Sequence, residues 1–272
     1  MTIIPFGCSH MQGILEGVKE FNGPLSDELF KSEMAGIVGG NSNQKIIEDV
    51  YRFSNKYQLD SKFHRPFDDG IKFFTPTLTS DKINLDDTVF YIQTTYTNRL
   101  WLPTTLDSHT SSFHTISLND SLLYINNAFA KKELSKFYEM YIKYFWNHYL
   151  NLLDLLQKID MLQTYLKSKN IPFVHMFWSF SGNDNEWQGY DIAEECDRDL
   201  SNVKEQINDI LTRIEFVKPY GCNTVTDWTN NLVTKQDINQ VFQKDELHIT
   251  KSLSYQLFKD VIYPECNLKI SL

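Results

Sequence analysis

The stretch Ile3-Ile4-Pro5-Phe6-Gly7-Cys8-Ser9-His10 decides how the rest of this chain is interpreted. Its four leading apolar residues predict a short buried strand, and Gly7 predicts a turn directly after it. Such a strand and turn would hold the Ser9 hydroxyl at the carboxyl end of a parallel sheet, where open α/β folds bind their ligands. Gly-x-Ser after a strand is common by chance, so its meaning depends on the other segments.

Further strand and helix patterns alternate along the chain. Residues 87–95 are rich in β-branched and aromatic residues, residues 171–178 are mostly apolar, and residues 35–40 predict a short strand and turn. The apolar spacing predicts helices from a cap at Ser42 or Asn43 to about Tyr57, within 131–169, over 199–213 and over 250–262. This alternation predicts an α/β fold, specifically a three-layer α/β/α sandwich around a central, mostly parallel sheet.

Several segments lack a regular pattern. Residues 11–25 contain three glycines and a proline, which predicts a loop, and residues 215–233 predict a short apolar piece with turns. Residues 103–130 are rich in Ser, Thr and Asn, which predicts an elaborated loop above the sheet. Because no internal repeat or low-complexity linker interrupts the chain, we expect one domain over residues 1–272.

The bulk composition excludes several classes of protein. The formal net charge of -9 would repel a phosphate backbone, so we expect no nucleic-acid partner. No run approaches the roughly 20 apolar residues of a membrane helix, and the N-terminus lacks the regions of a secretory signal. The four cysteines show no CxxC spacing, so neither a zinc knuckle nor a disulfide framework is expected. Together these features predict a cytoplasmic protein without a membrane partner.

Two more segments can supply the chemistry that a serine at a strand end requires. In Asp245-Glu246-Leu247-His248, the carboxylate can reach around a turn to the histidine and leave its Nε2 to accept a proton. In Gly39-Gly40-Asn41-Ser42-Asn43, a glycine turn leads into a helix N-terminus, where backbone N–H groups can approach a substrate closely. By contrast, His175 lies within an apolar strand and is predicted to be a hydrogen-bonded core histidine.

The order of these segments resembles the SGNH (GDSL-like) hydrolase superfamily, and especially the divergent SGNH-like proteins of tailed phages. Gly-x-Ser lies near the start, a Gly-x-Ser-Asn turn follows near residue 40, a strand ends in polar residues near 95, and Asp-x-x-His lies near the end. The resemblance extends over most of the chain, although each motif is short.

The resemblance implies a serine esterase that acts through an acyl-serine intermediate and needs no metal or cofactor. Ser9 would be the nucleophile, His248 the general base and Asp245 the residue that orients it. The backbone N–H groups of Ser9 and Gly40 would form the oxyanion hole. The implied substrate is an O-acylated carbohydrate or a similar small ester.

Two positions depart from the family pattern. Cys8 stands where the family has an aspartate, and Tyr96-Thr97-Asn98-Arg99 stands where it has Gly-x-Asn-Asp. Asn98 could supply the third oxyanion donor, but Thr95 or Arg99 could equally do so. We further expect His10, Asn43 and Arg99 to contact the substrate.

The departure from the family pattern at residues 96–99 motivates an alternative function that is not enzymatic. The same scaffold could serve as a catalytically weak or inactive binding module, or as a virion-associated structural component. In either case the chain could form a homo-oligomer, and its location would be the host cytoplasm or the virion. The separation between Ser9 and His248 would distinguish the enzyme from the structural module, since a working pair lies within hydrogen-bond reach.

Overall fold

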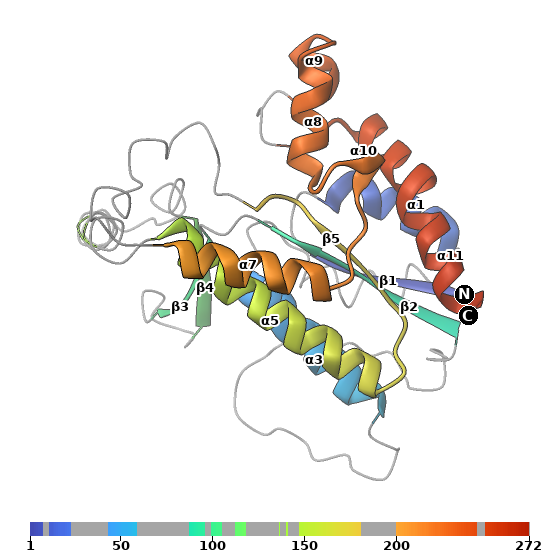
Figure 1. The fold of residues 1–272 in the computed structure, drawn as a ribbon. Helices are drawn as coiled ribbons and strands as arrows, with labels where there is room; N and C mark the ends of the chain where they lie inside the picture. The colour runs from blue at the N-terminus through green and yellow to red at the C-terminus, as the bar shows by residue number, and fades with distance from the viewer. Residues whose placement is uncertain are drawn as a thin grey trace.

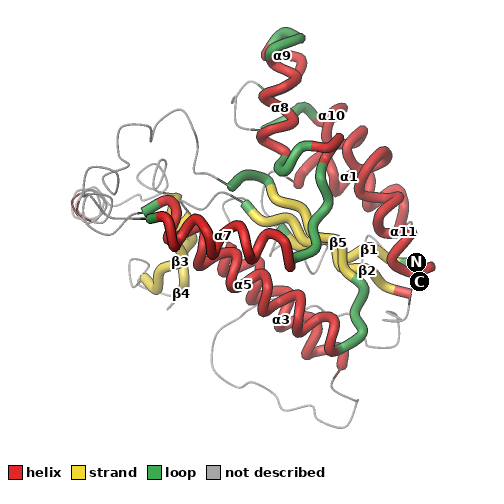
Figure 2. The backbone as a smooth tube through the Cα atoms, in the orientation of Figure 1, coloured by secondary structure: helices red, strands yellow, loops and turns green. Residues whose placement is uncertain are grey.

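The structure is a computed structural model of the 272-residue chain. It describes residues 1–7, 11–22, 43–58, 87–95, 99–104, 112–117, 136, 140, 147–180, 200–243 and 248–271. Within these residues the protein is a mixed α/β fold built on a small parallel sheet (Figures 1 and 2).

Three parallel strands form the sheet, in the order β1-β2-β5. They are β1 (Thr2–Phe6), β2 (Thr88–Thr94) and β5 (Phe173–Phe177), and each coincides with a strand predicted from the sequence. Phe90 of β2 pairs with Ile4 on one side and with Phe173 on the other. Every residue of β2 and β5 is buried, as expected for parallel strands that are covered on both faces.

One group of helices contains α3 (Asn43–Gln58), α5 (His148–Ser168) and α7 (Ser201–Arg213), which lie side by side in Figure 1. The helix predicted to end near Tyr57 is confirmed as α3, and the one predicted over 199–213 is confirmed as α7. Rings of Phe6, Phe53 and Phe90 pack against one another and join α3 to β1 and β2. Of the helix predicted within 131–169, the part from His148 onward is confirmed, and nearly all of the preceding part lies outside the described residues.

The second group contains α1 (Gln12–Asn22), α10 (Lys251–Leu257), the π-helical turn η5 (Phe258–Ile262) and α11 (Tyr263–Ser271). α1 packs along α10, and α11 contacts β2 and β5 (Figure 1). The predicted loop over 11–25 is therefore wrong, because Gly13 and Gly17 lie inside α1 where it touches other helices. The helix predicted over 250–262 is confirmed and continues to Ser271.

Short helices and a separate hairpin complete the described fold. Helix α8 (Val225–Val233) was predicted as turns. A capping box in which Thr224 and Asp227 exchange hydrogen bonds starts this helix. The 3-10 turn η4 (Pro219–Gly221) precedes α8, and α9 (Ile238–Val241) follows it. Strands β3 (Arg99–Thr104) and β4 (Ser112–Ser117) pair antiparallel, so the segment predicted as an elaborated loop over 103–130 contains a strand. Across the described residues, no helix has both the length and the apolar composition of a membrane span.

Candidate functional site

The carboxyl ends of the three parallel strands lie at one edge of the sheet, at Phe6, Thr94 and Phe177. In the sequence, Ser9 comes three residues after Phe6, and Asn98 comes four residues after Thr94. Ligands of open α/β folds bind outside this edge. It is therefore the candidate site, although Ser9, His10, Gly40, Asn98 and Asp245 lie outside the described residues.

Asn43 connects the start of α3 to the end of β2. Its Oδ1 accepts a hydrogen bond from the Thr95 backbone N at 2.6 Å, and its Nδ2 donates to the Thr95 backbone O at 3.1 Å. The Asn43 side chain is buried, so these bonds form away from water. Asn43 thus holds Thr95, the residue that follows β2 on the way to Asn98. The Thr95 N–H donates its hydrogen bond to Asn43.

α1 and α10 run in the same direction and approach each other very closely. A methyl group on Gly13 would overlap the side chain of Ser254 and would lie 3.3 Å from the Lys251 Cα. One helical turn further, a methyl group on Gly17 would overlap the ring of Phe258. The first turns of the two helices therefore lie side by side. In the sequence, Ser9 lies three residues before the start of α1 at Gln12, and His248 lies three residues before the start of α10 at Lys251.

Backbone hydrogen bonds hold the segment around His248. The N–H of Gln243 donates to the carbonyl of His248 at 2.7 Å, and the N–H of Thr250 donates to the carbonyl of Val241 at 2.9 Å. Phe242 and Ile249 form an antiparallel bridge between the two sides. Gln243 and His248, which flank residues 244–247 in the sequence and hence Asp245, are thus hydrogen-bonded to each other.

Two buried polar side chains on β2 and just after it lack hydrogen-bond partners. The amide of Gln93 and the hydroxyl of Thr95 have no exposed surface and make no hydrogen bond with the described part of the chain. The backbone of Gln93 lies near Gly7, because the Gln93 backbone carbonyl would be 3.3 Å from a methyl group on Gly7. An unsatisfied buried polar group costs about 1–3 kcal/mol, so such groups in a native fold are often functional. The sequence analysis missed both as candidate site residues.

A buried hydrogen-bond chain runs from β2 through β5 to α5. Thr94 Oγ1 lies 3.3 Å from His175 Nε2, and Gln163 Nε2 lies 3.4 Å from His175 Nδ1. Gln163 also bonds to both backbone groups of Glu215. Burial lowers the pKa of His175 to about 3, so its imidazole is neutral at physiological pH. The prediction of a hydrogen-bonded core histidine is confirmed.

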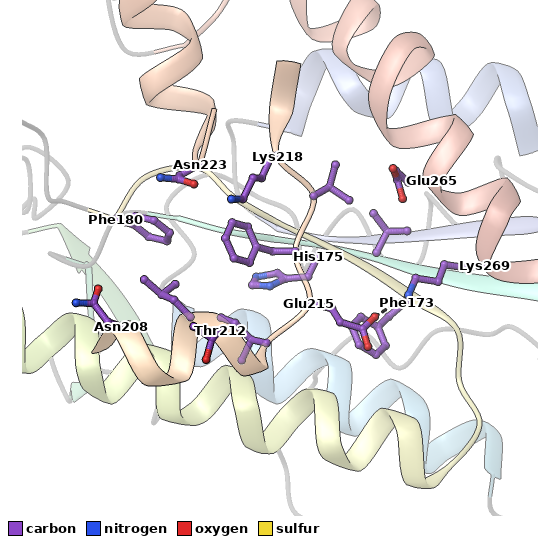
Figure 3. A pocket seen from close by; sticks show the side chains of 15 residues that line it. Phe173, His175, Phe180, Asn208, Thr212, Glu215, Lys218, Asn223, Glu265 and Lys269 are labelled. Atoms are coloured by element: carbon purple, nitrogen blue, oxygen red, sulfur yellow. Dashed lines mark hydrogen bonds and ion pairs between the residues drawn. The ribbon is translucent and has the colours of Figure 1, made fainter. Parts of the chain in front are cut away.

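A hollow of about 630 Å³ lies beside β5 (Figure 3). Residues of β5, α7, the segment 214–218 and α11 line it. None of the residues that line the hollow belongs to α1 or α10, so the hollow is separate from the place where these two helices pack together.

Neither a protein-family model, nor a curated protein, nor a solved structure is similar to this chain at a significant level.

The predicted site residues are therefore judged from the geometry alone. Of the eight, the structure describes the side chains of Asn43 and His248 and the backbone of Arg99, which begins β3. Asn43 and His248 lie near the ends of helices that flank the sheet, and the substrate contacts predicted for Asn43 and Arg99 stay predictions. Within the described part of the chain, no three His, Cys, Asp or Glu side chains gather as metal ligands.

Proposed function

We propose that this protein is a serine ester hydrolase of the SGNH type, with Ser9 as nucleophile and His248 as general base. The observation that carries the proposal is the parallel packing of α1 against α10 at Gly13 and against the following turn η5 at Gly17. α1 and α10 come from opposite ends of the sequence, and their first turns pack together. Ser9 precedes α1 and His248 precedes α10, so the proposal brings these two residues close together. A nucleophile and its base need this convergence.

The hydrogen bond between Gln243 and His248 supports a role for Asp245, which lies between them in the sequence. A carboxylate within a short paired loop can accept a hydrogen bond from Nδ1–H of the histidine and fix its tautomer. The two hydrogen bonds between Asn43 and Thr95 support a role in oxyanion binding for the segment after Thr95, which contains Asn98. A donor must be held rigidly to stabilise developing charge.

The proposed fold is a three-layer α/β/α sandwich. Its five-strand order would be flavodoxin-like, with the predicted strand 35–40 beside β1 and the segment 214–218 beyond β5. In support, the N–H of Val217 donates to the carbonyl of His175 at 2.8 Å, so this segment runs along the outer edge of β5.

The proposed reaction has two steps. Ser9 Oγ attacks the ester carbonyl while His248 takes its proton, and the oxyanion accepts hydrogen bonds from the N–H groups of Ser9 and Gly40 and from the Asn98 amide. The alcohol leaves with the proton from His248. Water, deprotonated by His248, then attacks the acyl-serine and releases the acid.

The proposed substrate is an O-acylated carbohydrate or a similar small ester, and the proposed location is the host cytoplasm or a virion. The second candidate function is a binding or virion-associated structural module on the same scaffold, as a monomer or a homo-oligomer. The departure at residues 96–99 favours this second candidate, because losing one oxyanion donor typically lowers turnover about 10²–10³-fold.

A fluorophosphonate probe tests the nucleophile directly. It forms a covalent bond with an activated serine and releases fluoride, and mass spectrometry then locates the added mass. We expect the adduct on Ser9 in the wild type, no adduct in Ser9→Ala, and slower labelling in His248→Gln. Equal labelling of the wild type and Ser9→Ala would refute Ser9 as nucleophile, and no labelling of any folded variant would favour the structural module.

A further inference from the structure

The hollow beside β5 divides into two chemically different halves (Figure 3). In the half near α11, the two carboxylate oxygens of Glu215 are each paired at 2.7 Å, one with Lys167 and the other with Lys269. Both ammonium groups are therefore held on one carboxylate, which offsets the charge of one of the two lysines. The other half contains Lys218, which pairs with no carboxylate of the described residues.

The half around Lys218 combines aromatic rings with neutral hydrogen-bonding groups. Phe180 and Phe216 are half-buried and pack edge-on with Phe177, which fixes the orientation of their rings. Asn223 and Lys218 lie on one side of Phe180 in Figure 3, and Asn208 lies on the other. The side chains of Lys218, Asn208 and Asn223 are exposed and can reach a ligand from the open side.

This combination fits one class of ligand. An apolar ring face can pack on Phe180 or Phe216, while the amides of Asn208 and Asn223 can bond to hydroxyl groups around the same ring. A fatty or aromatic acid would leave these amides without partners. The Lys218 ammonium lies 5.6 Å from the centre of the Phe216 ring, where it can meet a carboxylate on a bound group.

We propose that this half of the hollow binds an acidic sugar, one whose ring carries a carboxylate. The whole hollow has a volume of about 630 Å³, so the half around Lys218 can hold one sugar ring, and the open side lets a longer chain continue into solvent. Within a protein of net charge -9, attraction of an acidic glycan requires a local cation of this kind. The site is separate from the proposed catalytic centre and does not depend on ester hydrolysis.

A pair of trisaccharides tests the proposal. Trigalacturonate and the neutral galactotriose of the same linkage differ only at C6, where one has carboxylates and the other hydroxymethyl groups. In a calorimetric titration we expect trigalacturonate to bind the wild type at least about tenfold more tightly. This preference should weaken as the salt concentration rises. Equal affinity for the two sugars, or binding of neither, would overturn the proposal.

Surface variants locate the binding site. We expect Lys218→Gln to remove the preference for trigalacturonate and Asn223→Asp to abolish its binding by repulsion. Lys235→Gln, a matched change at an exposed lysine outside the hollow, should have no effect. Amide chemical shifts should move at Asn208 and Asn223 when the sugar binds. Unchanged affinity in Lys218→Gln, or shifts confined to other parts of the fold, would contradict the assignment.

Discussion

Asn43 at the start of α3 forms two side-chain hydrogen bonds with the backbone of a single residue, Thr95, at the end of β2. These two hydrogen bonds attach the start of α3 to the carboxyl edge of the sheet. They couple the start of α3, which follows Gly40 in the sequence, to the end of β2, which precedes Asn98. The proposed oxyanion donors come from these two segments.

The first prediction concerns this pair. Asn43→Ala leaves the buried N–H and carbonyl of Thr95 without partners, so we expect the free energy of unfolding to fall by about 2–3 kcal/mol. Urea denaturation measures the loss. Gln44→Ala, at the exposed next position of the same helix, is the control and should change stability by less than about 0.5 kcal/mol. A similar loss in both variants would mean that the Asn43 hydrogen bonds contribute little.

The second prediction concerns the close approach of α1 and α10. Gly17→Ala forces a methyl group into the ring of Phe258, and we expect a loss of about 1–3 kcal/mol in stability. In an ordinary exposed helix the same change would stabilise, because alanine is the better helix former. Thermal unfolding shows whether Gly17→Ala lowers or raises the stability. Lys19→Ala, on the exposed face of α1, is the control. An increase in stability would contradict the packing described here.

Most of the sheet could be predicted from the sequence, because the buried strands and the helices α3 and α7 have local apolar patterns. α1 could not be predicted, because in the sequence Gly13 and Gly17 resemble turn residues. Their role becomes clear only from the structure, in which Ser254 and Phe258 lie against them. That contact joins the two ends of the chain and has no local signature. α8 did have such a signature, the spacing of Thr224 and Asp227, and the capping box could have identified it.

The candidate site was predictable only in part. Ser9 and His248 follow from the order of short motifs, and the helices that follow them do converge. The unsatisfied groups of Gln93 and Thr95 have no sequence signal, because a polar residue near a strand end is usually hydrogen-bonded. Only the burial of their surroundings shows that they lack partners.

The third prediction uses these two residues. Gln93→Met and Thr95→Val keep the side-chain volume and remove the unsatisfied polar atoms, so we expect the free energy of unfolding to stay equal or rise by about 1 kcal/mol. If the groups serve the proposed site, ester turnover should fall in the same variants. Ser54→Ala, at a buried hydroxyl with hydrogen-bond partners, is the contrasting control and should lose stability. A clear loss of stability in Gln93→Met would indicate an ordinary structural role.

The fourth prediction concerns pH. The pKa of His175 is about 3 in the folded protein, below its ordinary value of 6.5, so the unfolded chain binds the proton more readily. Its contribution to stability is therefore fully present above pH 6.5 and is lost as the pH falls toward 3, at up to about 1.4 kcal/mol per pH unit. Urea midpoints between pH 7 and pH 4 should fall more steeply for the wild type than for His175→Gln. Parallel curves would show that His175 is not the group responsible.

The central claim is that Ser9 forms an acyl-enzyme, and the most direct measurement is the hydrolysis of p-nitrophenyl acetate by the wild type and by Ser9→Ala. Circular dichroism and thermal unfolding should first establish that both proteins are folded. The account predicts a measurable rate in the wild type that falls to the uncatalysed background in Ser9→Ala. Equal rates in the two folded proteins would contradict the acyl-serine mechanism and leave the binding or structural module as the better description.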